Sequence, residues 1–413
     1  VEVELRAGTS RGRLSRVITS SPARIEPRCA HVRECGGCPW QHMAYAEQLR
    51  LKRARLQAAV DAAAGRGRVH VGAVAAMPHD GPSGPWGFRH KVHFAFDQQR
   101  EGRLVMGHLQ PGSRRVFDAR ECPVHAARGN DVAFAVKAAL QHAGLPAGPP
   151  PRGVVRHVVS RVSRSSGEVV TTLVAAGNPP ALRRVSREVI EAGRPDGWHL
   201  NLYPRPDSLL FGPRTLHLDG RVRLREDIAG IRFLVSPASF FQTNVEAAAM
   251  LAAAVLDAVP CEAMRVLDLY AGLGFFALPL ARRGHRVTAV EESAPAVEDG
   301  EVSAKANGIG PARCRFVRAR AEHALGRLVR QAGTFDAVVL DPPRAGAGAA
   351  VIDRVRGIGP GRIVYVSCAP DALARDLAHL LSPRQAQAGY RLGAGAPLDM
   401  VPPPPPGGRP PGA

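Results

Sequence analysis

The first half of the chain alternates apolar and polar residues with a period of two, the pattern of a half-buried β-strand. The segments with this pattern are residues 1–22, 86–118 and 157–176, the last of which flanks Ser165-Ser166-Gly167 as a hairpin would. A helix-like stretch over residues 45–56 and a Pro-rich loop over residues 145–152 interrupt the pattern. We therefore predict a mainly β first half.

After about residue 226, short continuous apolar runs alternate with segments of helical periodicity. The runs are residues 265–269, 286–290, 335–340 and 363–366. Parallel strands covered by helices on both faces have this pattern. The second half is therefore predicted to be an α/β domain on a parallel, Rossmann-like sheet, with the domain boundary near residue 226. The Pro- and Gly-rich residues 401–413 are predicted to be a disordered tail.

Composition narrows the class of protein. Apolar residue types make up 45% of the chain, enough for an ordinary globular core. The longest apolar run near the middle, residues 247–256, is too short for a membrane-spanning helix, which needs ~18 residues. The first residues lack the apolar core of a signal peptide. We therefore expect a soluble, cytoplasmic, monomeric protein with no membrane partner.

The chain is strongly basic, with 55 Lys and Arg residues against 36 Asp and Glu residues and a formal net charge of +19. Nearly all of the basic residues are Arg, and an Arg-rich composition also arises from a GC-rich genome, in which case the surface is merely solvated. A polyanionic partner is nevertheless the simplest physical reason for so large a charge. The charge therefore favours a nucleic-acid partner.

A Gly-containing turn follows the predicted strand 265–269. Gly272 and Gly274 let the backbone approach a ligand closely, and the start of the following helix favours polar groups. The next strand ends at Glu291, where an acid can accept hydrogen bonds from both ribose hydroxyls of a nucleoside, although a solvated strand end is the alternative. The turn lacks the three spaced glycines of a dinucleotide site. This favours S-adenosyl-L-methionine over a nicotinamide cofactor.

Two further strands end in residues that could carry chemistry. Asp341 opens an Asp-Pro-Pro-Arg segment, and Cys368 lies between a strand and the helix that Pro370 opens. Ligands bind at this edge of open α/β sheets, and a helix N-terminus favours the thiolate form of a cysteine. A thiolate that adds to carbon 6 of uracil makes carbon 5 able to attack a methyl sulfonium, after which a base removes the carbon-5 proton. A buried structural cysteine is the alternative for Cys368.

Four of the seven cysteines form a candidate ligand set: Cys29, Cys35, Cys38 and Cys122. An odd number of cysteines in a cytoplasmic chain argues against a disulfide framework. Four thiolates are the ligand count of a [4Fe–4S] cluster, and structural zinc is the alternative. Zinc sites usually pair two Cys-x2-Cys motifs, whereas Cys122 stands alone, so the spacing favours iron–sulfur.

Together these motifs resemble those of the RNA 5-methyluridine methyltransferases, the uracil-C5 enzymes of transfer and ribosomal RNA. The matching segments are residues 35–42, 88–91, 239–244, 268–272, 341–346, 365–368 and 373–376, in the family's order. The resemblance implies a class I S-adenosylmethionine-dependent fold and an RNA substrate, 23S rRNA or tRNA. It also implies the following roles: Gln242, Tyr270, Glu291 and Asp341 contact S-adenosylmethionine, Cys368 is the nucleophile, and Cys29, Cys35, Cys38 and Cys122 hold a [4Fe–4S] cluster.

The resemblance also predicts the division of the chain. Residues 1–22 would be part of a TRAM-like β segment, residues 23–225 a cluster-binding and central β-rich RNA-binding domain, and residues 226–400 the methyltransferase domain. Near the end, Asp399-Met400 begins as the family does, but Pro and Gly replace the segment that carries the family's general-base Glu, and no acid follows Asp399. A catalytically impaired relative that binds RNA and a cluster is therefore an alternative. A cytosine-C5 enzyme is disfavoured, because such enzymes commonly have Pro-Cys where this chain has Pro343-Arg344.

Overall fold

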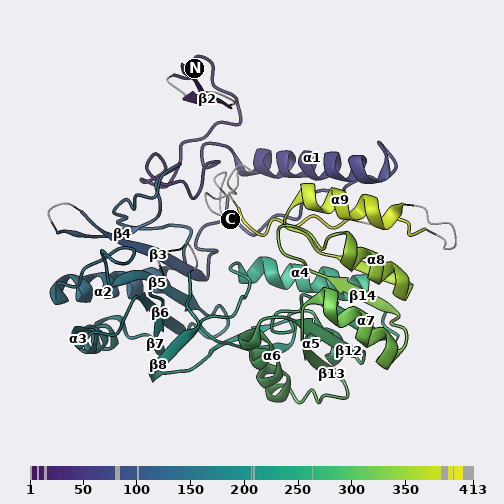
Figure 1. Ribbon diagram of the computed structural model, residues 1–413. Coiled ribbons are helices and arrows are strands. Elements are labelled where there is room, and N and C mark those ends of the chain that lie inside the picture. The colour runs from purple at the N-terminus through teal and green to yellow at the C-terminus, as the bar shows by residue number, and fades with distance from the viewer. Residues whose placement is uncertain are drawn as a thin grey trace.

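The computed structural model describes residues 2–6, 9–13, 16–79, 84–99, 102–205, 207, 210–262, 264–382, 389–393 and 395–402. Strands β1 (Glu2–Arg6) and β2 (Thr9–Arg13) form an antiparallel hairpin at the start of the chain (Figure 1), as the alternation predicted. Most of the predicted tail, residues 403–413, lies outside the described residues.

Helix α1 (Tyr45–Ala64) is eight residues longer than the predicted stretch 45–56 and lies along α9 (Pro370–Leu381), far away in the sequence (Figure 1). It ends at Gly65, whose φ of 93° favours glycine. Arg55 forms an ion pair with Asp371 at 3.4 Å in the first turn of α9. Further along, Ala63 packs against the apolar cluster to which α9 contributes. The two helices therefore run side by side in the same direction.

A six-stranded sheet of order β4-β3-β5-β6-β7-β8 forms the centre of the first half. Its strands are β3 (Lys91–Gln98), β4 (Leu104–Gly107), β5 (Val155–Val162), β6 (Val169–Ala175), β7 (Gly197–Leu202) and β8 (Arg214–Gly220). All neighbours are antiparallel except β6 and β7, and β5 and β6 form the predicted hairpin. Buried Phe94, Val158 and Trp198 belong to the core of this half.

Helices cover this sheet, so the first half is less β-rich than predicted. They are α2 (Ala127–Ala143), α3 (Ala181–Glu188) and a π-helical turn (Val189–Gly193). In α2, Val132, Val136 and Leu140 repeat at four-residue spacing and are buried. That spacing is the signal of an amphipathic helix that the alternation-based prediction passed over.

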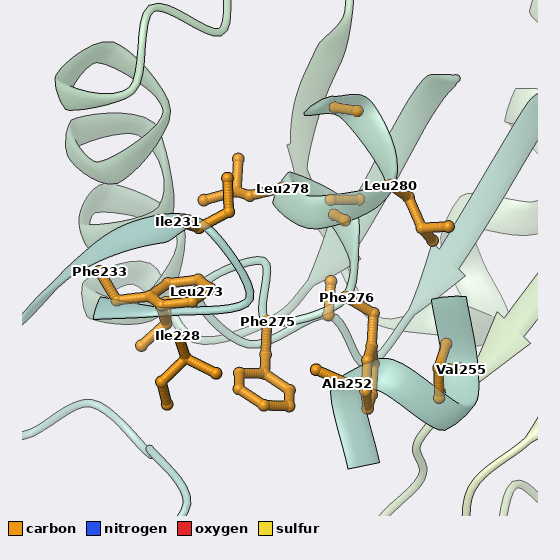
Figure 2. Packing of buried hydrophobic residues seen from close by; sticks show 14 of the residues in the cluster. Ile228, Ile231, Phe233, Ala252, Val255, Leu273, Phe275, Phe276, Leu278 and Leu280 are labelled. Atoms are coloured by element: carbon orange, nitrogen blue, oxygen red, sulfur yellow. The ribbon is translucent and has the colours of Figure 1, made fainter. Parts of the chain in front are cut away.

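The hairpin of β9 (Leu224–Ile228) and β10 (Ile231–Val235) joins the two halves. Its buried Ile228, Ile231 and Phe233 pack against Phe275 and Leu278 of the second half (Figure 2). The hairpin thus belongs by its packing to the second half. The first sheet ends before it, at Gly220, a few residues ahead of the boundary near 226 predicted from the sequence.

The second half is the predicted parallel α/β domain, with strand order β13-β12-β11-β14-β15. The strands, all parallel, are β11 (Arg265–Leu269), β12 (Arg286–Glu291), β13 (Cys314–Arg318), β14 (Ala337–Leu340) and β15 (Arg362–Tyr365). The helices are α4 (Val245–Ala258), α5 (Ala277–Arg282), α6 (Ala294–Ala306), α7 (Ala321–Ala332), α8 (Ala349–Ile358) and α9.

Alternate strand residues enter two separate cores. Val266 and Val339 join the cluster that includes α4 and α5, whereas Leu267 and Leu340 join the cluster that includes α7 and α8. Burial on both faces explains why the strands are continuous apolar runs in the sequence. Among the described residues, no helix is both long enough and apolar enough to span a membrane.

Candidate active site

The parallel sheet presents several predicted site residues at one edge. Leu269 pairs in register with Val290 on one side and with Leu340 on the other, and Leu340 pairs with Tyr365. The chain continues from these positions to Tyr270, Glu291, Asp341 and, after two further residues, Cys368. The carboxyl ends of four neighbouring strands therefore bring these four predicted residues to the same edge, where open α/β sheets bind ligands.

The turn after β11 is shaped by residues with positive φ. Tyr270 has a φ of 62°, Gly272 of 55° and Gly274 of 84°. A Cβ atom on Gly274 would lie 2.8 Å from the Phe316 ring, so this position requires glycine. Glu291 braces the turn, because its carboxylate accepts hydrogen bonds from the amides of Gly272 at 2.9 Å and Ser293 at 2.8 Å. A carboxylate offers about four acceptor sites, so Glu291 keeps capacity for a ligand.

Gln242 comes from a different place, the loop that precedes α4. The neighbouring Phe241 is buried and its ring meets that of Phe275, just after the β11 turn, edge-on at 5.9 Å. Asn244 caps α4 by accepting from the Ala247 amide at 3.1 Å, and its side-chain amide donates to the Met400 carbonyl at 3.1 Å. The Gln242 loop is thus fixed between the β11 turn and the last described part of the chain.

Cys368 is exposed in the short link between β15 and α9, and α9 begins at Pro370 as predicted. The link is held by Asp376 of α9, which is buried and accepts hydrogen bonds from the Ala347 amide at 2.7 Å and from the Tyr365 hydroxyl. A Cβ atom on Gly346 would lie 2.7 Å from the Asp376 carboxylate. Asp376 therefore ties the loop that follows Asp341 to the strand and helix on either side of Cys368.

The four predicted cluster ligands line one cavity of about 330 Å³ in the first half: Cys29, Cys35, Cys38 and Cys122. Gly36, Gly37 and Arg89 also line it. Burial raises the pKa of Cys38 to about 11 and that of Cys122 to about 12, whereas the positive charge of Arg89 lowers both. Burial therefore favours the neutral thiols here, and a bound cation would be needed to hold four thiolates together.

A second group of possible ligand atoms overlaps this cavity. The ligand atoms of His108, Cys122 and His125 lie within 4.8 Å of one another. Burial lowers the pKa of His108 to about 4 and that of His125 well below its ordinary value, so both rings are neutral, as metal ligation requires. The two histidines were not among the predicted site residues. His125 follows Cys122 at Cys-x2-His spacing, a sequence signal that was passed over, whereas His108 has no such spacing to any cysteine.

Comparison with known proteins assigns the chain to a family. A sequence profile of the tRNA (uracil-5-)-methyltransferases matches residues 222–388. An uncharacterized RNA methyltransferase of Thermosynechococcus vestitus is 36% identical over 95% of this chain and 84% of its own length. The chain belongs to the tRNA (uracil-5-)-methyltransferase family. A second relative, an uncharacterized RNA methyltransferase of Halalkalibacterium halodurans, is 31% identical over 97% of this chain and 86% of its own length.

A solved structure of this methyltransferase family matches nearly the full length of this chain. It is the Pyrococcus abyssi tRNA (uracil-54, C5)-methyltransferase in complex with S-adenosyl-L-homocysteine, with a TM-score of 0.75 and 26% identity over 98% of this chain and 88% of that one. Membership in the family makes the protein an RNA methyltransferase with S-adenosylmethionine as its cofactor.

The carboxyl groups at the sheet edge of this methyltransferase suit a cationic ligand. Burial raises the pKa of Asp341 to about 6. Burial, followed by the negative charge of Asp341, raises the pKa of the wholly buried Asp268 well above its ordinary value, although the Ala277 amide opposes that shift. Among the described residues, no donor meets hydrogen-bond geometry at either Asp268 carboxyl oxygen. A cation such as the sulfonium and ammonium groups of S-adenosylmethionine would stabilise both charged carboxylates.

Proposed function

We propose that the protein methylates carbon 5 of a uridine in structured RNA, a transfer or ribosomal RNA, with Cys368 as the nucleophile. The observation that carries the proposal is the exposed Cys368 thiol at the same sheet edge as Asp341 and Glu291. S-adenosylmethionine supplies the methyl group. The Cys368 sulfur would bond to carbon 6 of the uracil, so that carbon 5 takes the methyl, and the sulfur would leave after a base removes the carbon-5 proton.

The residues proposed to hold the cofactor are Gln242, Tyr270, Glu291 and Asp341. Glu291 would accept hydrogen bonds from the ribose hydroxyls, because it ends the strand next to the glycine turn. Asp341 would supply negative charge near the cationic end of the cofactor. Tyr270 lies within the turn that follows β11. The loop of Gln242 lies next to that turn, because the Phe241 ring contacts the Phe275 ring.

We expect Asp376→Asn to slow methyl transfer by roughly 10²-fold, the size of effect that a small misplacement of reacting groups produces. Both hydrogen bonds end on the same oxygen of Asp376, and the neutral Asn oxygen that replaces it lacks the negative charge that strengthens them. Tyr365→Phe removes one of the two bonds and should have a smaller effect. Steady-state rates measured with saturating S-adenosylmethionine should show a lower kcat with little change in the KM for the cofactor.

Asp353→Asn is the matched control for Asp376→Asn, because Asp353 lies on α8 and contacts His379 on the far part of α9. It should leave kcat within twofold of the wild type. Equal losses in both variants, or a loss confined to the KM of Asp376→Asn, would contradict a positioning role for Asp376.

The proposal includes a [4Fe–4S] cluster held by Cys29, Cys35, Cys38 and Cys122. The donor set fits, since four thiols from separate parts of the chain line one cavity with two glycines that allow close backbone approach. With all four irons coordinated, the cluster would serve as a structural staple between the Cys29–Cys38 segment and the loop that carries Cys122. Zinc held with His108 and His125 is the alternative that the second ligand group supports.

Protein purified without oxygen should be brown and contain about four irons and four sulfides per chain, by analogy with other Cys-ligated clusters. Cys38→Ser should lose the colour and most of the iron, measured by metal and sulfide analysis. Cys261→Ser is the matched control, because Cys261 is exposed and outside the cavity. Stoichiometric zinc without iron or sulfide would instead assign the cavity to a zinc site.

A second candidate function is that of a relative that binds RNA without completing the reaction. Asp399, the last acidic residue of the sequence, is buried, accepts a hydrogen bond from the Tyr45 hydroxyl at 2.8 Å and pairs with Lys52 at 2.5 Å. It therefore anchors the chain to α1 and is not free to act as a base. The two functions differ in the fate of the covalent adduct.

A further inference from the structure

A second cavity lies on α1, away from the sheet edge. Its volume is about 440 Å³, and a stripe of α1 residues forms one wall: Arg50, Arg53, Gln57 and Asp61. The turn that follows the helix forms the other wall, with Arg66 and His70. Arg68 lies exposed in the same turn. We call Arg50, Arg53, Arg66, Arg68 and His70 the α1 basic surface.

Hydrogen bonds from α1 side chains hold the turn that follows the helix. The Gln57 side chain donates to the Val69 carbonyl at 2.9 Å and accepts from the Val71 amide at 2.8 Å. Arg53 donates to the Val71 carbonyl at 3.0 Å and contacts the His70 ring nitrogen at 2.8 Å. The Asp61 carboxylate accepts from the Gly67 amide at 3.2 Å. These bonds hold residues 66–71 in a fixed position against the helix.

The charges of this surface are only partly neutralised. Arg50 is paired with Glu47 at 2.7 Å, and Asp61 is the acidic residue within the cavity wall. The side chains of Arg66 and Arg68 form no hydrogen bond or ion pair with any residue that the structure describes, and both residues are exposed. A rigid turn therefore presents two unpaired guanidinium groups beside two more on the helix. Guanidinium groups in such a setting suit the bidentate recognition of phosphate.

The surface also has a fixed relation to Cys368. The other side of α1 packs along α9, with Arg55 paired to Asp371 three residues after Cys368, and Lys52 pairs with Asp399. Because α1 with its side chains is ~10–12 Å thick, the basic surface lies about one helix diameter from α9. At that separation, the α1 basic surface would contact phosphates that lie a few nucleotides away from the target uridine.

We infer that the α1 basic surface binds the phosphate backbone of the substrate RNA outside the target loop. The inference rests on the RNA substrate of the proposed function and adds a contact surface that is separate from the catalytic edge. Since phosphate contacts release counterions, each contact contributes about 0.7–0.9 to the slope of log affinity against log salt concentration. Its contacts carry no base specificity, so they should act alike on any RNA of the same shape.

The test compares Arg66→Gln/Arg68→Gln with a matched pair, Arg183→Gln/Arg187→Gln. The matched pair removes the same charge from exposed positions on α3, which covers the central sheet away from α1 (Figure 1). Binding of a labelled stem-loop RNA is measured by fluorescence anisotropy between 50 and 300 mM salt, roughly the range in which phosphate contacts are resolved. The α1 pair should weaken binding at least about tenfold at the lowest salt and flatten the salt slope by about 1.4–1.8, whereas the α3 pair should change both little.

Two results would contradict RNA binding by the α1 basic surface. The inference is wrong if the two double variants bind RNA alike and with the same salt slope. It is also wrong if inorganic phosphate raises the melting temperature of the wild type but not of the α1 variant while RNA affinity is equal, because the cavity then takes a free anion. Unchanged S-adenosylmethionine affinity in both variants verifies their folding. If Cys368 fails to react with RNA but the α1 variant still binds it weakly, the surface stands and the proposed nucleophile does not.

Discussion

RNA in which 5-fluorouridine replaces the target uridine should trap the protein covalently in the presence of S-adenosylmethionine. After Cys368 adds to carbon 6 and the methyl reaches carbon 5, the fluorine cannot be removed as a proton, so the sulfur cannot leave. The adduct should appear as a band of lower mobility on a denaturing gel. Cys368→Ser should abolish the band and lower methyl transfer to normal RNA by roughly 10⁴-fold or more, the range for removal of a covalent nucleophile.

Cys261→Ser is the control for this experiment, since Cys261 is the other exposed cysteine among the described residues. It should be trapped like the wild type. Trapping that survives Cys368→Ser, or a wild type that is never trapped, would contradict the role of Cys368.

Normal uridine RNA distinguishes the two candidate functions. Turnover without a lasting adduct indicates that a residue or a water serves as the base. A methylated adduct that accumulates indicates the impaired relative, because a positioned base contributes ~10²–10⁴-fold to such a step.

Asp341→Asn should weaken S-adenosylmethionine binding and, at the same time, raise the stability of the empty protein at pH 7.5. Burial raises the pKa of Asp341 from 3.8 to about 6. A folded-state pKa above the unfolded value means that stability is largest below both values and falls as the pH rises from about 4 to 6. At about two pKa units, ionising Asp341 costs up to about 3 kcal/mol at pH 7.5, which the neutral Asn avoids.

The measurements are the melting temperature and the cofactor affinity as functions of pH. Wild-type affinity should fall as the pH drops through about 6, because protonation removes the charge that attracts the cofactor, and the variant should be flatter there. Asp219→Asn, at an exposed position on β8, should match the wild type in both measurements. A variant that is less stable than the wild type at pH 7.5 would show that the ionised Asp341 carboxylate does not destabilise the folded protein.

The elements that the sequence predicted best are those in which burial alone decides the residue types. Strand β11 is buried from Val266 to Leu269 and was predicted at its observed bounds. Strand β13 was missed because Cys314 is its one fully buried residue, while Arg315 interrupts its apolar run and Arg318 ends it. Cys122 was predicted to join the other three cysteines from the count of thiols and from the family resemblance, and all four line one cavity.

In the candidate site, too, the features set by the strands could be predicted from the sequence, and those set by tertiary packing could not. Strand register alone brought Glu291 and Asp341 to one edge, so their proximity could be predicted from the parallel sheet. Asp268 belongs to the segment 268–272 that resembles the family, but only the packed structure shows that it is wholly buried, with no donor among the described residues that meets hydrogen-bond geometry at its carboxyl oxygens. The Asp376 clamp was also hidden, because a carboxylate on a helix gives no sign in the sequence of which loop it will meet.

The contact of α1 with α9 and Asp399 affects the order in which the protein folds during synthesis. Tyr45 and Asp399 are separated by 354 positions, so α1 emerges from the ribosome long before its partners exist. Until then its apolar side remains uncovered, a state in which nascent chains are vulnerable to aggregation. Closure of this contact is therefore a late step in biogenesis. A fragment restricted to residues 222–388, the part that the family profile covers, would leave one side of α9 bare.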